Sequence, residues 1–231
     1  MQLAFVPRRN GLDNVIIVQE ILHTMSLKKG GIDYMAIKID LEKAYDRLEW
    51  SFIQDTLSLF NVPPYLISVI RSCVSSSSVV VLFNGGALED FKPSQGIRQG
   101  DLLSPYIFIM CMEVLGFLIK DECDSNLWDP IKASRGGPAF SHLFFVDDLV
   151  LFGKANEKNC RSNKDTLEVF CELSRQKVNN DKSRIYFSPN VEDYRRDMIC
   201  SCLNLHSTPN LGTYLGFLMR MQNVIFFSLN L

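Results

Sequence analysis

The hydrophobic pattern of residues 34–41 (YMAIKIDL) predicts a β-strand, because two sets of side chains alternate with a period of two. One set is entirely apolar: Met35, Ile37, Ile39 and Leu41. Lys38 and Asp40 lie on the opposite face, together with Ala36. The predicted strand therefore ends in an acid on its more polar face.

A second apolar stretch, residues 142–153 (HLFFVDDLVLFG), predicts two short strands with Asp147 and Asp148 at the bend. Adjacent anions repel each other, and aspartate is common in turns because it hydrogen-bonds its own backbone. A solvated turn is therefore one interpretation. The apolar runs on both sides instead favour a rigidly packed tip.

Asp40 also ends a strand, so three carboxylates converge if the two predicted strands are neighbours in one sheet. Three close anions require cations between them, and Mg²⁺ prefers one or two carboxylates together with phosphate oxygens. Two such ions about 3.5–4 Å apart activate the attacking oxygen and stabilise the leaving oxygen in phosphoryl transfer. The alternative hypothesis is therefore a two-metal site.

The rest of the pattern predicts helices alternating with hairpins and strands. Helices are expected at residues 12–25, 43–60, 105–120, 156–174 and 191–203. A hairpin with an Asn-Gly turn is expected at residues 79–91, and strands at 184–188 and 214–219. Asp13 or Asn14 is expected to cap the first helix. This order predicts an α+β fold in which helices cover one face of an antiparallel sheet.

Composition bounds the class of protein. The 231 residues are 47% hydrophobic and 22% charged, as in a globular domain with a sizeable core. A net charge of −2 and a pI near 5.9 give no overall electrostatic attraction to nucleic acid, so such a partner requires local sites. No apolar run approaches 18 residues, so no membrane span is expected.

Seven cysteines without a CxxC pair predict free thiols in a reducing compartment. No targeting signal distinguishes cytoplasm from nucleus, and the oligomeric state is not indicated.

Six short segments occur in order along the chain: FVPRRNGLDN from Phe5, KIDLEKAYDRLEW from Lys38, SQGIRQGDLLSPYIF from Ser94, FVDD from Phe145, KVNNDKS from Lys177 and YLGF from Tyr214. Together they resemble the reverse transcriptase domain of LINE-type (non-LTR) retrotransposons of plant type. The resemblance implies a right-hand polymerase palm with part of the fingers. It implies a partial fingers segment at 1–34, the palm at 35–218 and an unmatched tail at 219–231. The chain is expected to be a truncated fragment that ends before a thumb.

The resemblance assigns the metal ligands and the chemistry. Asp40, Asp147 and Asp148 are implied to bind two Mg²⁺ ions, with Mn²⁺ as the alternative. The implied reaction is attack of a primer 3′-hydroxyl on the α-phosphate of a deoxynucleoside triphosphate, directed by an RNA or DNA template. Lys182 is implied to be the general acid that protonates the pyrophosphate, and Arg9 and Asn14 to contact the template.

The same resemblance places an aromatic ring, Tyr45, under the sugar, where it would collide with a ribose 2′-hydroxyl. A helix-start aromatic packed in the core is the competing interpretation.

In residues 94–101, glycines allow the backbone to approach a ligand closely, and Arg98 supplies a charge for phosphate. The resemblance implies that Gln99 and Gly100 line the nucleotide pocket. The alternative is a glycine-rich surface turn.

Several positions depart from the family pattern: Arg8, Leu102, Val146 and Arg175. Arg175 stands where a glycine usually precedes QKVN, and a positive φ there would cost arginine roughly 1–2 kcal/mol. Two hypotheses follow. The chain is an RNA-directed DNA polymerase domain, or it is an inactive remnant that keeps the palm only as a fold. A palm-fold nucleotidyl cyclase fits less well, because it does not require the SQGIRQGD loop followed by YLGF.

Overall fold

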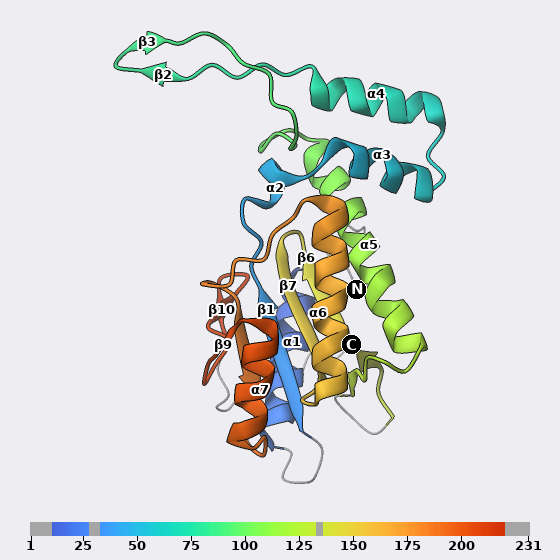
Figure 1. Ribbon diagram of the computed structural model, residues 1–231, viewed down its shortest axis with the longest axis vertical. Coiled ribbons are helices and arrows are strands. Elements are labelled where there is room, and N and C mark those ends of the chain that lie inside the picture. The colour runs from blue at the N-terminus through green and yellow to red at the C-terminus, as the bar shows by residue number, and fades with distance from the viewer. Residues whose placement is uncertain (1–10, 28–32, 133–135, 220–231) are drawn as a thin grey trace.

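The computed structural model describes residues 11–27, 33–132 and 136–219, and its centre is a five-stranded sheet (Figure 1). The strands lie in the order β6-β7-β1-β8-β9. Their bounds are His142–Phe145 (β6), Asp148–Lys154 (β7), Tyr34–Ile39 (β1), Arg184–Phe187 (β8) and His206–Ser207 (β9). All neighbouring pairs are antiparallel except β8 and β9. The chain therefore has the predicted α+β architecture, with β1 in the middle of the sheet.

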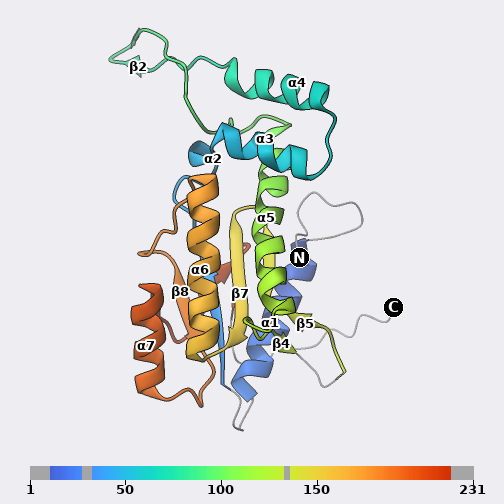
Figure 2. The same cartoon turned by 45° about the vertical axis from the view of Figure 1, so that its right-hand side comes forward.

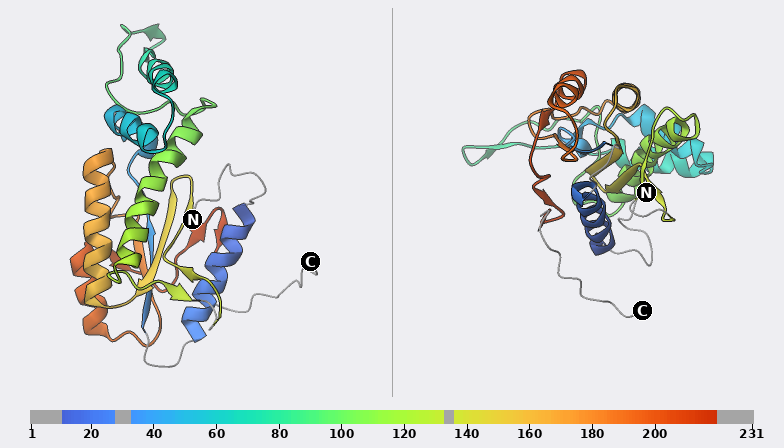
Figure 3. Two further views of the ribbon diagram at one scale, coloured as in Figure 1. Left: turned by 90° about the vertical axis from the view of Figure 1, so that its right-hand side faces the viewer. Right: turned by 90° about the horizontal axis from the view of Figure 1, so that it is seen from below.

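Helices cover both faces of this sheet (Figure 3). On one face lie α5 (Ser104–Asp124), α6 (Glu157–Ser174) and α7 (Asp193–Leu203), and on the other lies α1 (Gly11–Leu27). The alternation of β1 explains this arrangement: Met35, Ile37 and Ile39 belong to the buried cluster with α5 and α6. Tyr34 and Ala36 belong to a second cluster with α1. The prediction of helices on one face only is therefore incomplete.

A smaller layer lies beyond one end of the sheet (Figure 2). It contains α2 (Ala44–Arg47), α3 (Trp50–Leu59), α4 (Pro64–Ser75) and the hairpin of β2 (Leu82–Phe83) and β3 (Gly86–Ala87). The single helix predicted at 43–60 is thus two helices, separated at Leu48, whose backbone is extended (φ −62°, ψ 119°). Helix α4 was not predicted, although Pro64 occupies the first helical position that proline favours.

Two further short hairpins complete the described chain. They join β4 (Ile131–Lys132) to β5 (Ala139–Phe140), and β10 (Thr213–Tyr214) to β11 (Phe217–Leu218). The single strand predicted at 214–219 is wrong, because Leu215 and Gly216 both have positive φ (50° and 79°) and form a tight turn. Neither Asp13 nor Asn14 caps α1, because that helix already begins at Gly11.

The remaining predicted elements are confirmed within a few residues: the hairpins at 79–91 and 142–153, the helices at 105–120, 156–174 and 191–203, and the strand at 184–188. The predicted limits at residues 34 and 218 stay predictions, and almost all of the tail at 219–231 lies outside the described residues. No helix in the described ranges combines the length and apolar character that crossing a membrane requires.

Candidate active site

The three predicted acids lie at the same end of the two central strands. In the β1–β7 pair Ile39 is opposite Leu149, so Asp40 follows β1 where Asp148 begins β7. In the β6–β7 hairpin the last pair is Phe145 with Asp148, which leaves Val146 and Asp147 as the turn. The predicted neighbourhood of the two acidic strand ends is therefore confirmed, although Asp40 and the doublet are far apart in sequence.

Electrostatic interactions link the three carboxylates. Burial is the largest cause of a raised pKa at Asp148; Lys38 lowers this pKa, and Asp147 and Asp40 raise it. Asp40 and Asp148 are half-buried, whereas Asp147 is exposed. In the described residues no three His, Cys, Asp or Glu side chains converge closely enough to hold a metal ion. The acids are thus neighbours whose repulsion a cation would relieve, and they do not form a closed ligand shell.

A pocket of about 820 Å³ opens beside the acidic turn. Its lining includes Asp147, Asp148, Tyr45, Gln99 and Gly100. The structure thus brings together residues from the β6–β7 hairpin, the start of α2 and the 94–101 loop.

Arg98, predicted to bind the nucleotide, and Asp40, predicted to bind metal, lie outside this pocket. Arg98 is exposed and lines an adjoining pocket of about 640 Å³, which it shares with Gln99. Asp40 does not line the pocket, but it lies next to Asp148, which does.

Tyr45 is packed against the core and also lines the pocket, while its role under the sugar stays a prediction. Its ring stacks on Phe108 of α5, with ring centroids 4.8 Å apart and planes at 12°, as in a packed core. The residue also lines the pocket with Asp147. Burial, and then the negative charge of Asp147, raise the pKa of Tyr45. The phenol therefore stays neutral at the mouth of the site.

The 94–101 loop is attached to the chain that follows β1, so it is not a free surface turn. The Gly96 N–H donates to the Leu48 carbonyl (2.8 Å), and the Ile97 N–H donates to the Tyr45 carbonyl (2.9 Å). Gly96 has a φ of +86°, and a Cβ there would lie 2.6 Å from the Asp46 carbonyl oxygen. Only glycine fits this approach.

Sequence reasoning missed Lys38 as a member of the site. Its Nζ donates to the Thr213 carbonyl (2.5 Å), and its charge lowers the pKa of Asp148. The signal was present, because the period of two places Lys38 on the same face as Asp40. Lys38 therefore connects the acidic strand ends to the β10–β11 hairpin.

The structure does not bring the remaining predicted residues to the pocket. Arg9 lies outside the described residues. Asn14 is fully buried, and its Nδ2 donates to the Phe144 carbonyl (3.1 Å). This burial does not support a direct template contact. Lys182 is exposed in the loop before β8, where its N–H donates to the Asn179 carbonyl (3.2 Å), and it does not line the pocket.

Val146 is strained. It has a φ of 54°, a left-handed conformation that is unfavourable for a β-branched residue. Such conformations persist where the surrounding structure enforces them, and they concentrate at functional sites. Here the strained residue immediately precedes the exposed carboxylate Asp147, which is thereby held at the tip of the hairpin.

A mostly antiparallel sheet with acids at its central strand ends, an open pocket beside them and covering helices defines the class of partial polymerase palms. The chain belongs to the family described as Reverse transcriptase (RNA-dependent DNA polymerase), which it matches over residues 2–219. The predicted resemblance is thereby confirmed.

Relatives include retrotransposon proteins. The Pol polyprotein of the type-2 retrotransposable element R2DM of Drosophila melanogaster is 31% identical over 153 residues, which cover 66% of this chain and 14% of that protein. The transposon TX1 149 kDa protein of Xenopus laevis is 24% identical over 180 residues, or 77% of this chain and 13% of that protein. The chain thus spans only about one seventh of these relatives. A 40% identical, 70-residue match to an uncharacterized mitochondrial protein of Arabidopsis thaliana, covering 30% of this chain and 57% of that protein, is only a weak indication of a plant-type element.

The structure resembles telomerase in fold. Telomerase from Candida albicans matches 79% of this chain and 31% of its own, with a TM-score of 0.56 and 17% identity. Telomerase from Candida tropicalis matches 78% of this chain and 30% of its own, with a TM-score of 0.54 and 18% identity. These likenesses support the palm architecture.

Proposed function

We propose that this chain is the catalytic palm of a retroelement reverse transcriptase, which extends a primer along an RNA or DNA template with deoxynucleoside triphosphates. The observation that best supports this proposal is the β1–β7 register, which places Asp40 beside Asp148 next to a pocket lined by Asp147 and Tyr45. The telomerases of similar fold are described in complex with a telomeric RNA fragment, which supports a nucleic-acid partner.

Reverse transcriptases use divalent metal ions, and the donor set suits two Mg²⁺ ions, or Mn²⁺. Asp40, Asp147 and Asp148 offer only carboxylate oxygens, which hard cations prefer, and their mutual repulsion falls when a cation binds. Bound metal would supply polarisation of the phosphoryl group and neutralisation of the developing charge. The residues themselves supply a rigid platform, since Asp40 directly follows β1 and Asp148 is the first residue of β7.

The pocket residues then position the nucleotide. Gln99 would offer its amide and Gly100 a backbone without a side chain, and the exposed Arg98 in the adjoining pocket would bind the triphosphate. Tyr45, fixed by its stack on Phe108, presents its ring to the sugar and excludes a 2′-hydroxyl. In the proposed reaction the primer 3′-hydroxyl releases its proton to solvent, its oxygen bonds to the α-phosphorus, and the bond to the pyrophosphate oxygen breaks. Lys182 lies outside the pocket, so its proposed role as the acid that protonates the pyrophosphate requires the loop before β8 to move towards the site.

Arg9 is proposed to contact the template backbone, where phosphate contacts position a strand without reading its sequence. For Asn14 we propose an indirect role, since its buried amide supports the β6 strand that leads to the acidic turn. The activity, substrates and partners of any longer protein containing this chain are part of the same proposal.

The second candidate is an inactive remnant. The observation that favours it is that, within the described ranges, the carboxylates do not converge into a metal-holding group. This hypothesis predicts a folded protein that binds no Mg²⁺ at the acidic turn and extends no primer.

Primer extension with Mg²⁺, a primed RNA template and deoxynucleotides tests both hypotheses. We expect extension by the wild type, its loss in Asp147→Asn, and its retention in Asp55→Asn, which removes an exposed acid on α3 outside the pocket. No extension above a heat-killed control, by protein that circular dichroism shows to be folded, would support the remnant.

A further inference from the structure

We propose that Trp50 is a positioning residue that clamps the nucleotide-binding loop, residues 94–100, against the segment carrying Tyr45. Its indole N–H donates to the Gly96 carbonyl (2.7 Å). This inference rests on the proposed function, because it assigns a role in nucleotide affinity to a residue outside the pocket. Trp50 is not among the residues that line the pocket, so its proposed effect is transmitted through the loop.

Gly96 is held on both sides of its backbone. Its N–H donates to Leu48, and its carbonyl accepts from Trp50. The next residue, Ile97, is 5% exposed and donates to the Tyr45 carbonyl. The loop is therefore bonded to residues 45–50 through Gly96 and Ile97 before it enters the pocket. Because Gly100 follows only three residues after the last of these bonds, their geometry fixes where Gln99 and Gly100 lie relative to the Tyr45 ring.

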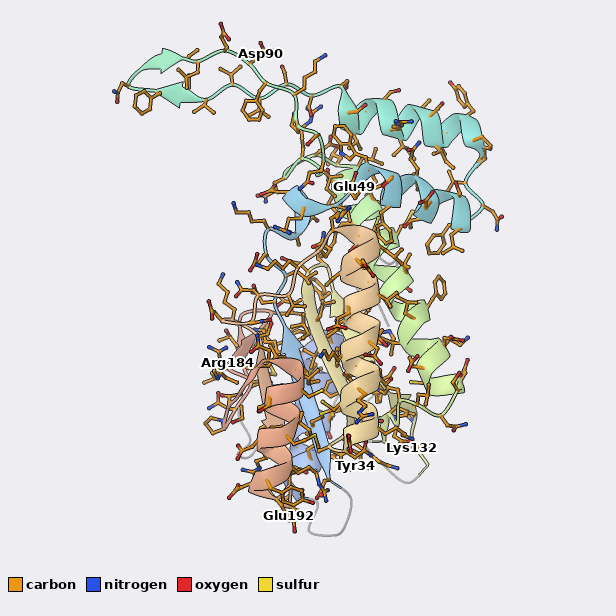
Figure 4. All side chains as sticks on the ribbon, in the orientation of Figure 1. Tyr34, Glu49, Asp90, Lys132, Arg184 and Glu192 are labelled. Carbon is orange, nitrogen blue, oxygen red and sulfur yellow. The ribbon has the colours of Figure 1, made fainter. Side chains whose placement is uncertain are left out.

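The clamp is itself anchored to both layers of the molecule. The Glu49 N–H donates to the carbonyl of Ser174, the last residue of α6 (3.2 Å), and Figure 4 labels Glu49 at this junction. Trp50 is partly buried, and its ring lies with Ile67 and Val74 of α4 around a cavity of about 10 Å³. A tryptophan is suited to this position, because its body packs between helices while its single donor reaches a backbone carbonyl.

Replacement of the indole by a phenyl ring keeps the apolar body and removes the donor. The Gly96 carbonyl then loses its partner at a partly buried position, and the loop has one bond fewer to the Tyr45 segment. The loop is expected to populate conformations in which Gln99 and Gly100 no longer face Tyr45. Nucleotide affinity and the preference for deoxynucleotides should both fall, whereas the chemical step in the correctly assembled site should not change.

The chain offers a matched control in its other tryptophan. Trp128 also donates its indole N–H to a backbone carbonyl, that of Phe152 (2.8 Å), and it is 1% exposed. It lies beside β7 and away from the pocket. Trp128→Phe therefore removes the same kind of hydrogen bond, at a comparable or greater cost in stability, without touching the loop.

The experiment compares wild type, Trp50→Phe and Trp128→Phe in two assays. Primer extension gives KM for deoxynucleotide and kcat separately. Limited trypsin cleavage after the exposed Arg98 reports loop docking without requiring catalysis. We expect Trp50→Phe to raise KM and the cleavage rate by about fivefold to thirtyfold, with kcat within about twofold of wild type. Trp128→Phe should change neither quantity. Equal behaviour of the two variants in both assays would overturn the proposal.

Two further measurements keep the outcome decisive. In Trp128→Phe, Trp50 is the remaining tryptophan, so its fluorescence should change on addition of dATP, and no change would overturn the clamp even if Trp50→Phe failed to fold. If folded wild type extends no primer, the proposed polymerase activity is wrong, and the clamp is still tested separately. In that case dATP should still slow cleavage after Arg98 in wild type and not in Trp50→Phe, and the absence of this protection would overturn the inference.

Discussion

Arg175 gives a sharp test of backbone strain, because its side chain can be removed in two ways. It is the C-cap of α6 and has a left-handed backbone, with φ 60° and ψ 13°. The side chain is exposed, and the interaction made by its carbonyl, acceptance of a hydrogen bond from Arg47 Nε (3.2 Å), belongs to the main chain. A glycine at this position retains that bond.

The magnitude follows from two opposing terms. The left-handed conformation costs a residue with a Cβ about 1–2 kcal/mol. Glycine avoids this cost but gains freedom in the unfolded chain, which offsets about 0.5–1 kcal/mol. Arg175→Gly should therefore raise the free energy of unfolding by about 1 kcal/mol, which corresponds to an increase in Tm of about 2–4 °C for a domain of this size.

Urea unfolding followed by circular dichroism measures this change, with an unchanged m-value as the sign that only native stability has moved. The matched control is Arg175→Ala, which removes the same guanidinium but keeps the Cβ, and it should leave stability within about 0.5 kcal/mol of wild type. Equal stabilisation by alanine and glycine would show that the guanidinium, and not the backbone, was the source of strain. Destabilisation by glycine would refute the reasoning outright.

Three further predictions concern single positions. Burial lowers the pKa of His142 to about 3, so the folded state keeps the imidazole neutral. The contribution of this group to the free energy of unfolding should be fully present above the ordinary pKa of 6.5 and fall as the pH drops towards 3. In urea unfolding, His142→Phe should therefore show a smaller loss of stability over this acid range. Gly96→Ala should lower the free energy of unfolding by about 3 kcal/mol, because backbone strain adds to the clash with Asp46. Gly100→Ala should lower it by about 1–2 kcal/mol, because Gly100 has a φ of +88° but open space around it. Thermal unfolding distinguishes the two variants. Asn14→Ala should lower the free energy of unfolding by about 1–3 kcal/mol and leave KM for the primed template unchanged. A rise in that KM would instead support a direct contact between Asn14 and the template.

The features that could be predicted from the sequence are those set by local periodicity. The apolar runs around Asp147 and the alternation ending at Asp40 each specify a strand, and both strands are present. That these strands are neighbours was a hypothesis, because a period of two says which face a residue occupies and not which strand lies beside it. The register of Ile39 with Leu149 supplied the missing information.

The features that could not be predicted depend on distant partners. The helix expected at 43–60 breaks at Leu48 and Glu49, where the backbone bonds to Gly96 and to Ser174 instead of continuing a helix. No local pattern contains either partner. Asn14 was assigned to the template by the family resemblance alone, yet its amide donates to the Phe144 carbonyl inside the fold. Trp50 is the last residue of the KIDLEKAYDRLEW segment, but nothing in that segment indicates that its partner is Gly96.

The central position of β1 has a consequence for the order in which the protein is made. β1 is synthesised before both of its partners, residues 148–154 and 184–187, which follow it by more than a hundred residues of chain. A nascent chain therefore carries an apolar strand with two open edges until those residues emerge, a situation that slows folding and invites association with other chains. Asp40 meets Asp148 only then, so cations cannot be gathered at this edge of the sheet before β7 has been made.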